Sequence, residues 1–176
     1  MRFVATLAVF GFALTLAHAD DLKTDAKFGG AFNVKAFTGE KKGETLCYVC
    51  KYNAEARPAV VLIFTKKADE NIATMVKSVD EVQKSNKDLG TVVVGISGVT
   101  GADLEKLQET HKLTTPLTVA SDKDGPSRYS LTPDAEVTVL VYKKGGNIVE
   151  KFAFSDTKSA AAKSKAIVEA AKTALK

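Results

Sequence analysis

The sequence predicts a single α/β domain built on a mixed central sheet, and three observations lead to this fold class. The unbroken apolar run over residues 59–64 and the valine-rich segment over residues 91–96 are typical of strands that are buried on both faces. Helical periodicity follows each run, which gives the strand–helix–strand–helix order of a parallel βαβ unit. The chain then ends in a β-hairpin pattern and an alanine-rich helix. These elements together predict one sheet with helices packed on it.

The N-terminus has the pattern of an export signal. Arg2 precedes an apolar run over residues 3–16, and Ala17 and Ala19 form the small-x-small pattern that signal peptidase reads. The run is too short to span a membrane, and no cysteine stands at the expected cleavage point to carry a lipid. We therefore predict a signal peptide over residues 1–19, no membrane anchor, and an exported protein that is periplasmic or extracellular.

The first half of the exported chain predicts two strands and one long helix. Residues 31–37 alternate enough to form a strand, and residues 38–43 form a turn. Pro58 opens the first buried strand, residues 59–64. Asp69 is a capping candidate for the helix that follows. The apolar residues of that helix share one face and are core candidates: Ile72, Met75, Val76, Val79 and Val82.

The middle of the chain repeats the strand-to-helix pattern. Residues 91–96 predict the second buried strand and residues 97–101 a loop. Residues 102–111 predict a helix that ends at His111. A cation is favoured at a helix C-terminus, so capping explains His111 better than catalysis does.

The last part of the chain predicts the closing hairpin and helix. Residues 137–142 and 147–152 are strand-like and flank a Lys-Lys-Gly-Gly turn. Residues 160–175 predict the final helix, with one apolar side. Since neither a repeat nor a linker interrupts these elements, residues 20–176 form one domain.

Composition excludes several classes of protein. With 45% hydrophobic and 26% charged residues, the chain is not intrinsically disordered. The net charge of +4 comes with scattered lysines and no aromatic interleaving, so we expect no nucleic-acid partner. Two cysteines exclude a disulfide-dense scaffold, and two histidines leave little room for a multi-histidine metal cage.

Several segments resemble one known family. Residues 115–125, with the sequence TPLTVASDKDG, resemble the P-L-x-x-x-D-x-D-G stretch of peroxiredoxins of the alkyl hydroperoxide reductase/TSA type, with one more residue before Asp122. Residues 93–97 look like the second strand of that group, and residues 128–131 stand where it has x-Y-G-V. The resemblance covers residue 28 to the C-terminus. It implies a thioredoxin-like fold of the peroxiredoxin-like branch, with residues 137–149 as its closing hairpin.

The functional residues of that family do not carry over. The resemblance implies a reactive cysteine just after the first central strand, where residues 65–70 read TKKADE instead. The Trp-Cys-x-x-Cys pattern of thioredoxins is absent from the same junction. Thioredoxin-fold oxidoreductases also place a cis-proline directly before the first hairpin strand, whereas Pro133 lies four residues before Val137. We therefore expect neither a standard peroxidase nor a standard thioredoxin.

Cys47 and Cys50 form a Cys-x-x-Cys, the one constellation with clear chemical promise. The spacing lets the two sulfurs form a disulfide, and the charge of Lys51 favours a thiolate. We predict Cys47 and Cys50 as catalytic residues that exchange disulfides with a dithiol or disulfide of a protein partner. By analogy with other Cys-x-x-Cys proteins, Cys47 would attack and Cys50 would resolve. Tyr48 and Tyr52 either dock that partner or pack onto the sheet.

Two alternatives stay open. The pair is a structural disulfide of a non-catalytic accessory or binding domain, worth about 2 kcal/mol for so short a loop, or two thiolates bind copper(I). Covalent haem is excluded because Lys51 stands where that motif requires histidine. We expect no cofactor and no resident metal, and the oligomeric state is not predicted. The linker after Cys50 enters its strand at the N-terminal edge, but it is long enough for the cysteines to reach either edge.

Overall fold

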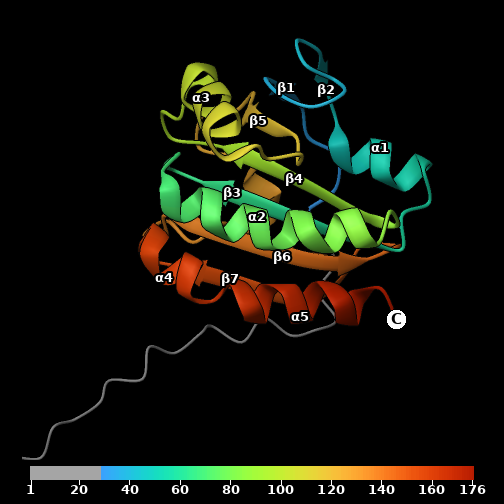
Figure 1. Cartoon of the computed structure of the whole chain (residues 1–176). Coiled ribbons are helices and arrows are strands. Elements are labelled where there is room, and N and C mark those ends of the chain that lie inside the picture. Colours follow the sequence, from blue (N-terminus) through green and yellow to red (C-terminus); the bar gives the residue numbers. More distant parts are fainter. Residues whose placement is uncertain (1–28) are drawn as a thin grey trace, which may run out of the picture.

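The computed structural model in Figure 1 describes residues 29–176, which form a seven-stranded mixed sheet with helices on both faces. The predicted signal peptide, residues 1–19, lies outside the described residues. In chain order the elements are β1 (Val34–Ala36), β2 (Thr45–Leu46), α1 (Tyr48–Ala54), β3 (Ala59–Thr65), α2 (Glu70–Ser85), β4 (Leu89–Gly95), α3 (Gly101–His111), β5 (Leu117–Ala120), a 3₁₀ turn (Ser127–Tyr129), β6 (Val137–Lys143), β7 (Asn147–Phe154), α4 (Thr157–Ala162) and α5 (Ser164–Ala174).

The centre of the sheet confirms the predicted βαβ unit and hairpin. The strand order is β2-β1-β5-β4-β3-β6-β7, with β3 parallel to β4 and antiparallel to β6. All seven residues of both β3 and β4 are buried, as predicted for strands that are covered on both faces. The hairpin of β6 and β7 closes around the predicted Lys-Lys-Gly-Gly turn.

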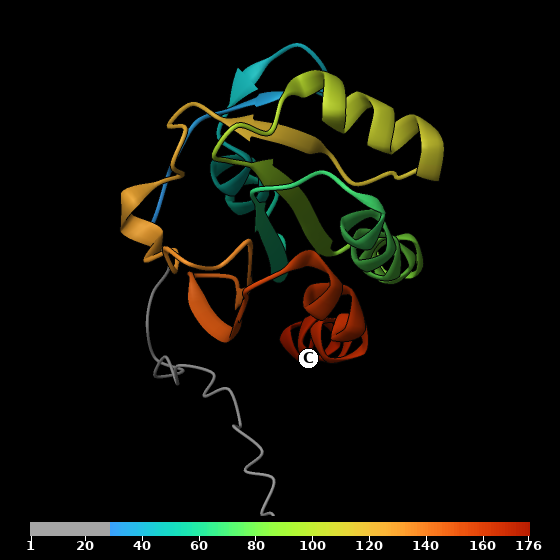
Figure 2. The same cartoon turned by 90° about the vertical axis from the view of Figure 1, so that its left-hand side faces the viewer.

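Two hydrophobic layers cover the sheet. The first layer contains the apolar sides of α2, α3 and α5, with Ile72, Leu104 and Ile167 fully or almost fully buried in it. The second layer lies on the opposite face, where α1 packs over the alternate residues of β3 and β4. Figure 2 shows α1 and α2 on opposite sides of the strands. The two cysteines therefore belong to the helix that covers the second face.

The predicted helix boundaries are confirmed where capping residues mark them. Asp69 caps α2 by accepting hydrogen bonds from the N–H groups of Asn71 and Ile72, at 3.1 and 3.0 Å. His111 is the last residue of α3, as predicted.

Other elements differ from the prediction. The strand predicted over residues 31–37 is only Val34–Ala36. The helix predicted over residues 160–175 is two helices, because the chain turns at Lys163, whose φ of −98° and ψ of 9° are not helical. The first of these helices begins before the predicted start, at Thr157, because Asp156 accepts a 2.7 Å hydrogen bond from the N–H of Ser159.

Across residues 29–176, the helices are all too short or too polar to cross a bilayer.

Candidate functional site

Cys47 and Cys50 form a disulfide at the beginning of α1, with their Cα atoms 5.3 Å apart. Cys47 is the N-cap residue, and its Sγ accepts a hydrogen bond from the N–H of Cys50 at 3.1 Å. An N-cap side chain satisfies one of the N–H groups that have no partner within the helix. Reduction of the disulfide leaves Cys47 Sγ as the acceptor of an N–H group, an arrangement that stabilises a thiolate.

The pairing of β2 decides where this disulfide lies relative to the sheet. Val34 of β1 pairs with both Leu46 of β2 and Ala120 of β5, and both pairings are antiparallel. Strand β2 therefore runs parallel to β5, β4 and β3, and Cys47 directly follows its last residue. The disulfide thus stands at a strand-to-helix junction of the same polarity as the β3–α2 junction, but at the opposite border of the sheet from β6 and β7. The linker then leads the chain back to the N-terminal end of β3.

Buried aromatic side chains attach α1 to the sheet. Tyr48, Val49 and Tyr52 are almost fully buried, and the Tyr52 hydroxyl donates a 2.6 Å hydrogen bond to the carbonyl oxygen of Thr91. The Tyr52 ring lies against Gly90, where an added Cβ would stand only 2.9 Å from two ring carbons. Both tyrosines therefore pack onto the sheet, which was one of the two alternatives that the sequence left open.

The two cysteine residues differ in their exposure to solvent. Cys47 is half-buried against the second hydrophobic layer, whereas Cys50 is exposed. A cavity of about 370 Å³ lies beside Cys50 and is lined by Val49, Val60 and Tyr142 among other residues. Of the two cysteines, Cys50 is therefore the one that borders this cavity.

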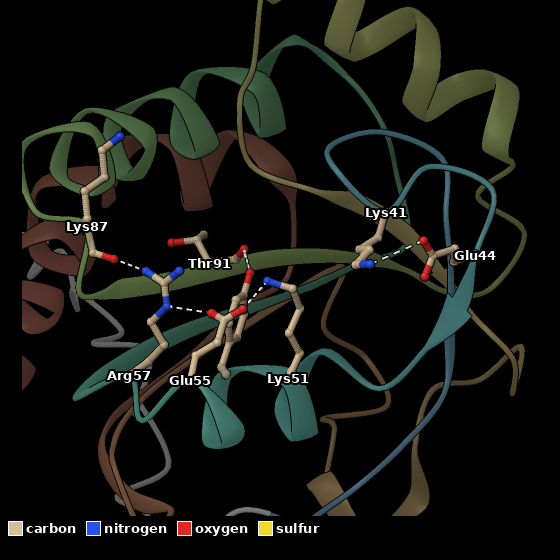
Figure 3. Close-up of polar contacts among 8 residues, drawn as sticks. Lys41, Glu44, Lys51, Glu55, Arg57, Lys87 and Thr91 are labelled. Atoms are coloured by element: carbon tan, nitrogen blue, oxygen red, sulfur yellow. Dashed lines mark hydrogen bonds and ion pairs between the residues drawn. The ribbon is translucent and has the colours of Figure 1, made fainter.

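A chain of ionic contacts holds the C-terminal end of α1, as Figure 3 shows. The Glu55 carboxylate contacts Lys51 Nζ and lies 2.8 Å from Arg57 Nε. Arg57 also donates from Nη1 to the carbonyl oxygen of Lys87. The hydrogen bond from Lys51 holds the pKa of Glu55 below its usual range, and Arg57 adds to this effect. These contacts fix the linker between α1 and β3.

In peroxiredoxins, the family that the sequence resembles, the β3–α2 junction carries the catalytic cysteine. In this chain the same junction makes other contacts. Lys67 Nζ lies 2.5 Å from Glu136 Oε1, and the N–H of Lys66 donates to the Glu136 carbonyl oxygen at 2.9 Å. Asp69 caps α2 and also accepts a 2.7 Å hydrogen bond from the hydroxyl of Thr157. No peptide bond is cis within residues 29–176. This junction therefore offers structural contacts and no thiol chemistry.

Metal ligands do not gather around the cysteines. Within residues 29–176, no three histidine, cysteine, aspartate or glutamate side chains come together as a cluster that could hold a metal ion. His111 lies at the end of α3, which packs in the layer on the opposite face from α1. Copper(I) would therefore have only the two sulfurs as ligands from this group of residues.

Similarity to known proteins is found in the comparison of structures and not in the comparisons with protein families and curated proteins. The chain matches no protein-family model and no curated protein. Peroxidoxin BcpB from Mycobacterium tuberculosis shares 15% identity with a TM-score of 0.61, over 85% of this chain and 98% of that one. A candidate thiol:disulfide interchange protein DsbE from Chlorobium tepidum shares 15% identity with a TM-score of 0.60, over 86% of this chain and 98% of that one. A candidate protein disulfide isomerase from Bacteroides thetaiotaomicron shares 15% identity with a TM-score of 0.59, over 83% of this chain and 89% of that one.

These neighbours confirm the predicted thioredoxin-like fold. In this chain the fold is built on a mixed seven-stranded sheet. At this level of identity the likeness establishes the fold alone. The function therefore rests on the geometry of the site itself.

The two tyrosines of α1 give a matched test of how the helix is held. The hydroxyl of Tyr48 is buried without a hydrogen-bond partner in the described chain, whereas that of Tyr52 bonds to Thr91. We expect Tyr48→Phe to leave stability unchanged or raise it by about 1 kcal/mol, and Tyr52→Phe to lower it by about 1 kcal/mol. Urea unfolding at pH 7 measures both, and an equal loss in the two variants would contradict this assignment.

The buried hydroxyl of Tyr48 also predicts how the stability of the protein changes at alkaline pH. Burial raises the pKa of Tyr48 to about 12, with the nearby Glu40 and Glu44 adding to the effect. The folded state then holds the phenolic proton more tightly than the unfolded state, whose tyrosine pKa is about 10. The contribution of Tyr48 is complete below pH 10 and is lost as the pH rises towards 12. Unfolding between pH 9 and 11.5 should therefore show a shallower loss of stability in Tyr48→Phe than in the wild type.

Proposed function

We propose that this protein is an exported thiol–disulfide redox protein that acts through Cys47 and Cys50 on a disulfide or dithiol of a protein partner. The observation that carries the proposal is an accessible disulfide across the first turn of a helix, with Cys47 as N-cap and a cavity beside Cys50. Exchange needs a sulfur that an incoming thiolate can reach and a leaving sulfur that is stable as a thiolate. The exposure of Cys50 supports the first condition, and the hydrogen bond to Cys47 Sγ supports the second.

Export supports the same proposal. A periplasmic or extracellular location keeps the pair oxidised at rest, since disulfides persist in oxidising compartments. An oxidised pair receives electrons from a partner dithiol, and a reduced pair would donate them to a partner disulfide. The predicted signal over residues 1–19 is the feature from which this location is proposed.

The redox potential of the Cys47–Cys50 pair tests the proposal. Equilibration in glutathione buffers, followed by alkylation of free thiols, should give a potential between about −120 and −270 mV, where known thiol–disulfide exchange proteins lie. The protein should also accelerate the reduction of insulin disulfides by dithiothreitol. A potential below about −300 mV would instead indicate a structural disulfide, and it would refute the redox function.

A second candidate is a non-catalytic accessory domain with a structural disulfide. The β3–α2 junction favours it, because the Lys67–Glu136 ion pair and the capping role of Asp69 stand where family members carry the reactive cysteine. In this case a variant with both cysteines replaced by serine would keep its function and lose only about 2 kcal/mol of stability.

A further inference from the structure

The exposure of the two sulfurs points to the order in which they react. Cys50 is exposed and lines the cavity, whereas Cys47 is half-buried against the second hydrophobic layer. A thiolate attacks a disulfide along the axis of the sulfur–sulfur bond, so the attacked sulfur must be open on the side away from its partner. Cys50 is the more exposed of the two cysteine residues, which favours attack at its sulfur.

The hydrogen bond at the start of α1 also favours attack at Cys50, because it stabilises Cys47 as the leaving sulfur. Cys47 Sγ accepts the N–H of Cys50 at 3.1 Å, so the negative charge that develops on a departing Cys47 is stabilised at once. Exchange is faster when the leaving thiol is the more stable thiolate.

The charges around the cavity indicate the approach of the partner. Arg57 and Lys144 are the charged residues that line it, and both are cationic. Arg57 is already engaged with Glu55 and the carbonyl of Lys87, while Lys144 is exposed on the hairpin turn. The backbone N–H of Lys144 donates to the Pro58 carbonyl oxygen at 2.8 Å, which holds this turn against the start of β3. An anionic group beside the incoming thiol is therefore favoured.

We propose that disulfide exchange runs through Cys50, with Cys47 as the leaving and resolving sulfur, and that the incoming thiol belongs to an acidic polypeptide segment that enters over the Cys50 cavity. This inference rests on the proposed redox function and reverses the order expected from the analogy with other Cys-x-x-Cys proteins. It makes Cys50 the residue that is covalently joined to the partner.

The steps balance without any further reagent. The partner thiolate forms a bond to Cys50 Sγ, the Cys47–Cys50 bond breaks, and Cys47 leaves with the electron pair. A second thiolate of the partner then attacks the partner's own sulfur in the mixed disulfide and releases Cys50 as a thiolate. The partner loses two electrons and gains a disulfide, while the protein becomes the dithiol. In the reverse direction Cys50 attacks the partner disulfide and Cys47 resolves the mixed disulfide.

Mapping the mixed disulfide tests the order of attack. The oxidised full-length exported protein is mixed with glutathione, quenched with N-ethylmaleimide, and cleaved with chymotrypsin after Tyr48, which separates the two cysteines. We expect glutathione on Cys50 and maleimide on Cys47, in at least about tenfold excess over the opposite product. Glutathione on Cys47, or an equal mixture, would overturn the inference and leave the redox function standing. A disulfide that glutathione does not open would overturn both.

Two small thiols of opposite charge test the route of approach. Mercaptoethanesulfonate is anionic and cysteamine is cationic, and each is used to reduce the wild type and Lys144→Gln. Because the intrinsic reactivities of the thiols cancel between the two proteins, the comparison isolates the charge of Lys144. We expect the rate ratio of anionic to cationic thiol to fall about twofold in Lys144→Gln at low salt, and the difference to shrink at high salt. An unchanged ratio would overturn the proposed approach over this cavity.

Discussion

Insulin reduction by Cys47→Ser is expected to fall to the uncatalysed rate, with the variant accumulating as a mixed disulfide on Cys50. Cys50 remains exposed and can still be joined to a partner sulfur. The sulfur that would break that bond from within the protein is gone, because Cys47 is the only other cysteine of the chain. Turbidity of reduced insulin measures the loss, and mass spectrometry of the alkylated variant measures the trapped adduct.

The serine substitution is expected to keep the fold of α1, which makes this variant informative. Serine is a preferred N-cap residue, so its hydroxyl can accept the N–H of Cys50 as Cys47 Sγ does. The matched control is Cys50→Ser, which should also be inactive but should trap far less adduct because Cys47 is half-buried. Unchanged insulin reduction in Cys47→Ser would refute the redox function.

Replacing Asp80 with alanine is expected to cause the largest loss of stability of the substitutions considered, about 3 kcal/mol. Asp80 lies on α2 and is only 1% exposed. Its Oδ2 accepts the N–H of Thr114 at 2.6 Å, and its Oδ1 accepts the N–H of Thr115 at 2.9 Å. The hydroxyls of both threonines donate to the same carboxylate. Alanine would leave the N–H and the hydroxyl of fully buried Thr115 without their partner, and this is costly in a low-dielectric interior.

A nearby exposed carboxylate is the control for this effect. Glu81→Ala removes the side chain of an exposed residue on the same helix, and it should change the unfolding free energy by no more than about 0.5 kcal/mol. Urea unfolding monitored by circular dichroism measures both variants. A loss below about 1 kcal/mol in Asp80→Ala would contradict the assignment of this carboxylate as the anchor of the segment before β5.

Elements with a long, uniform signal were predicted well. Two mainly apolar segments predicted β3 and β4, and the Asp69 cap with the apolar helix face after it predicted α2. The Gly-Gly turn between two strand-like segments predicted the hairpin of β6 and β7. In each case one local rule and the burial of the segment indicate the same structure, so no distant residue is needed to decide it.

Short elements escaped prediction because their partners are distant in sequence. Strand β2 has two residues and exists through its pairing with β1, and β5 has four residues between β1 and β4. Helix α1 has seven residues, too few to be stable alone, and Tyr48, Val49 and Tyr52 hold it against the sheet. Asp80 escaped as well, because a charged residue in an apolar helix face gives no signal of the threonines that it binds.

The sequence by itself determined the α/β class, the βαβ unit and the hairpin. It also identified Cys47 and Cys50 as the candidate redox pair. These features depend on residue type, periodicity and local spacing. Only the tertiary structure decided where that pair stands. Strand pairing places it at the start of α1 after a strand parallel to β3, and packing buries Cys47 more than Cys50. The direction of β2 and the exposure of the two cysteines are set by contacts between segments far apart in the chain. Local residue spacing does not predict such contacts.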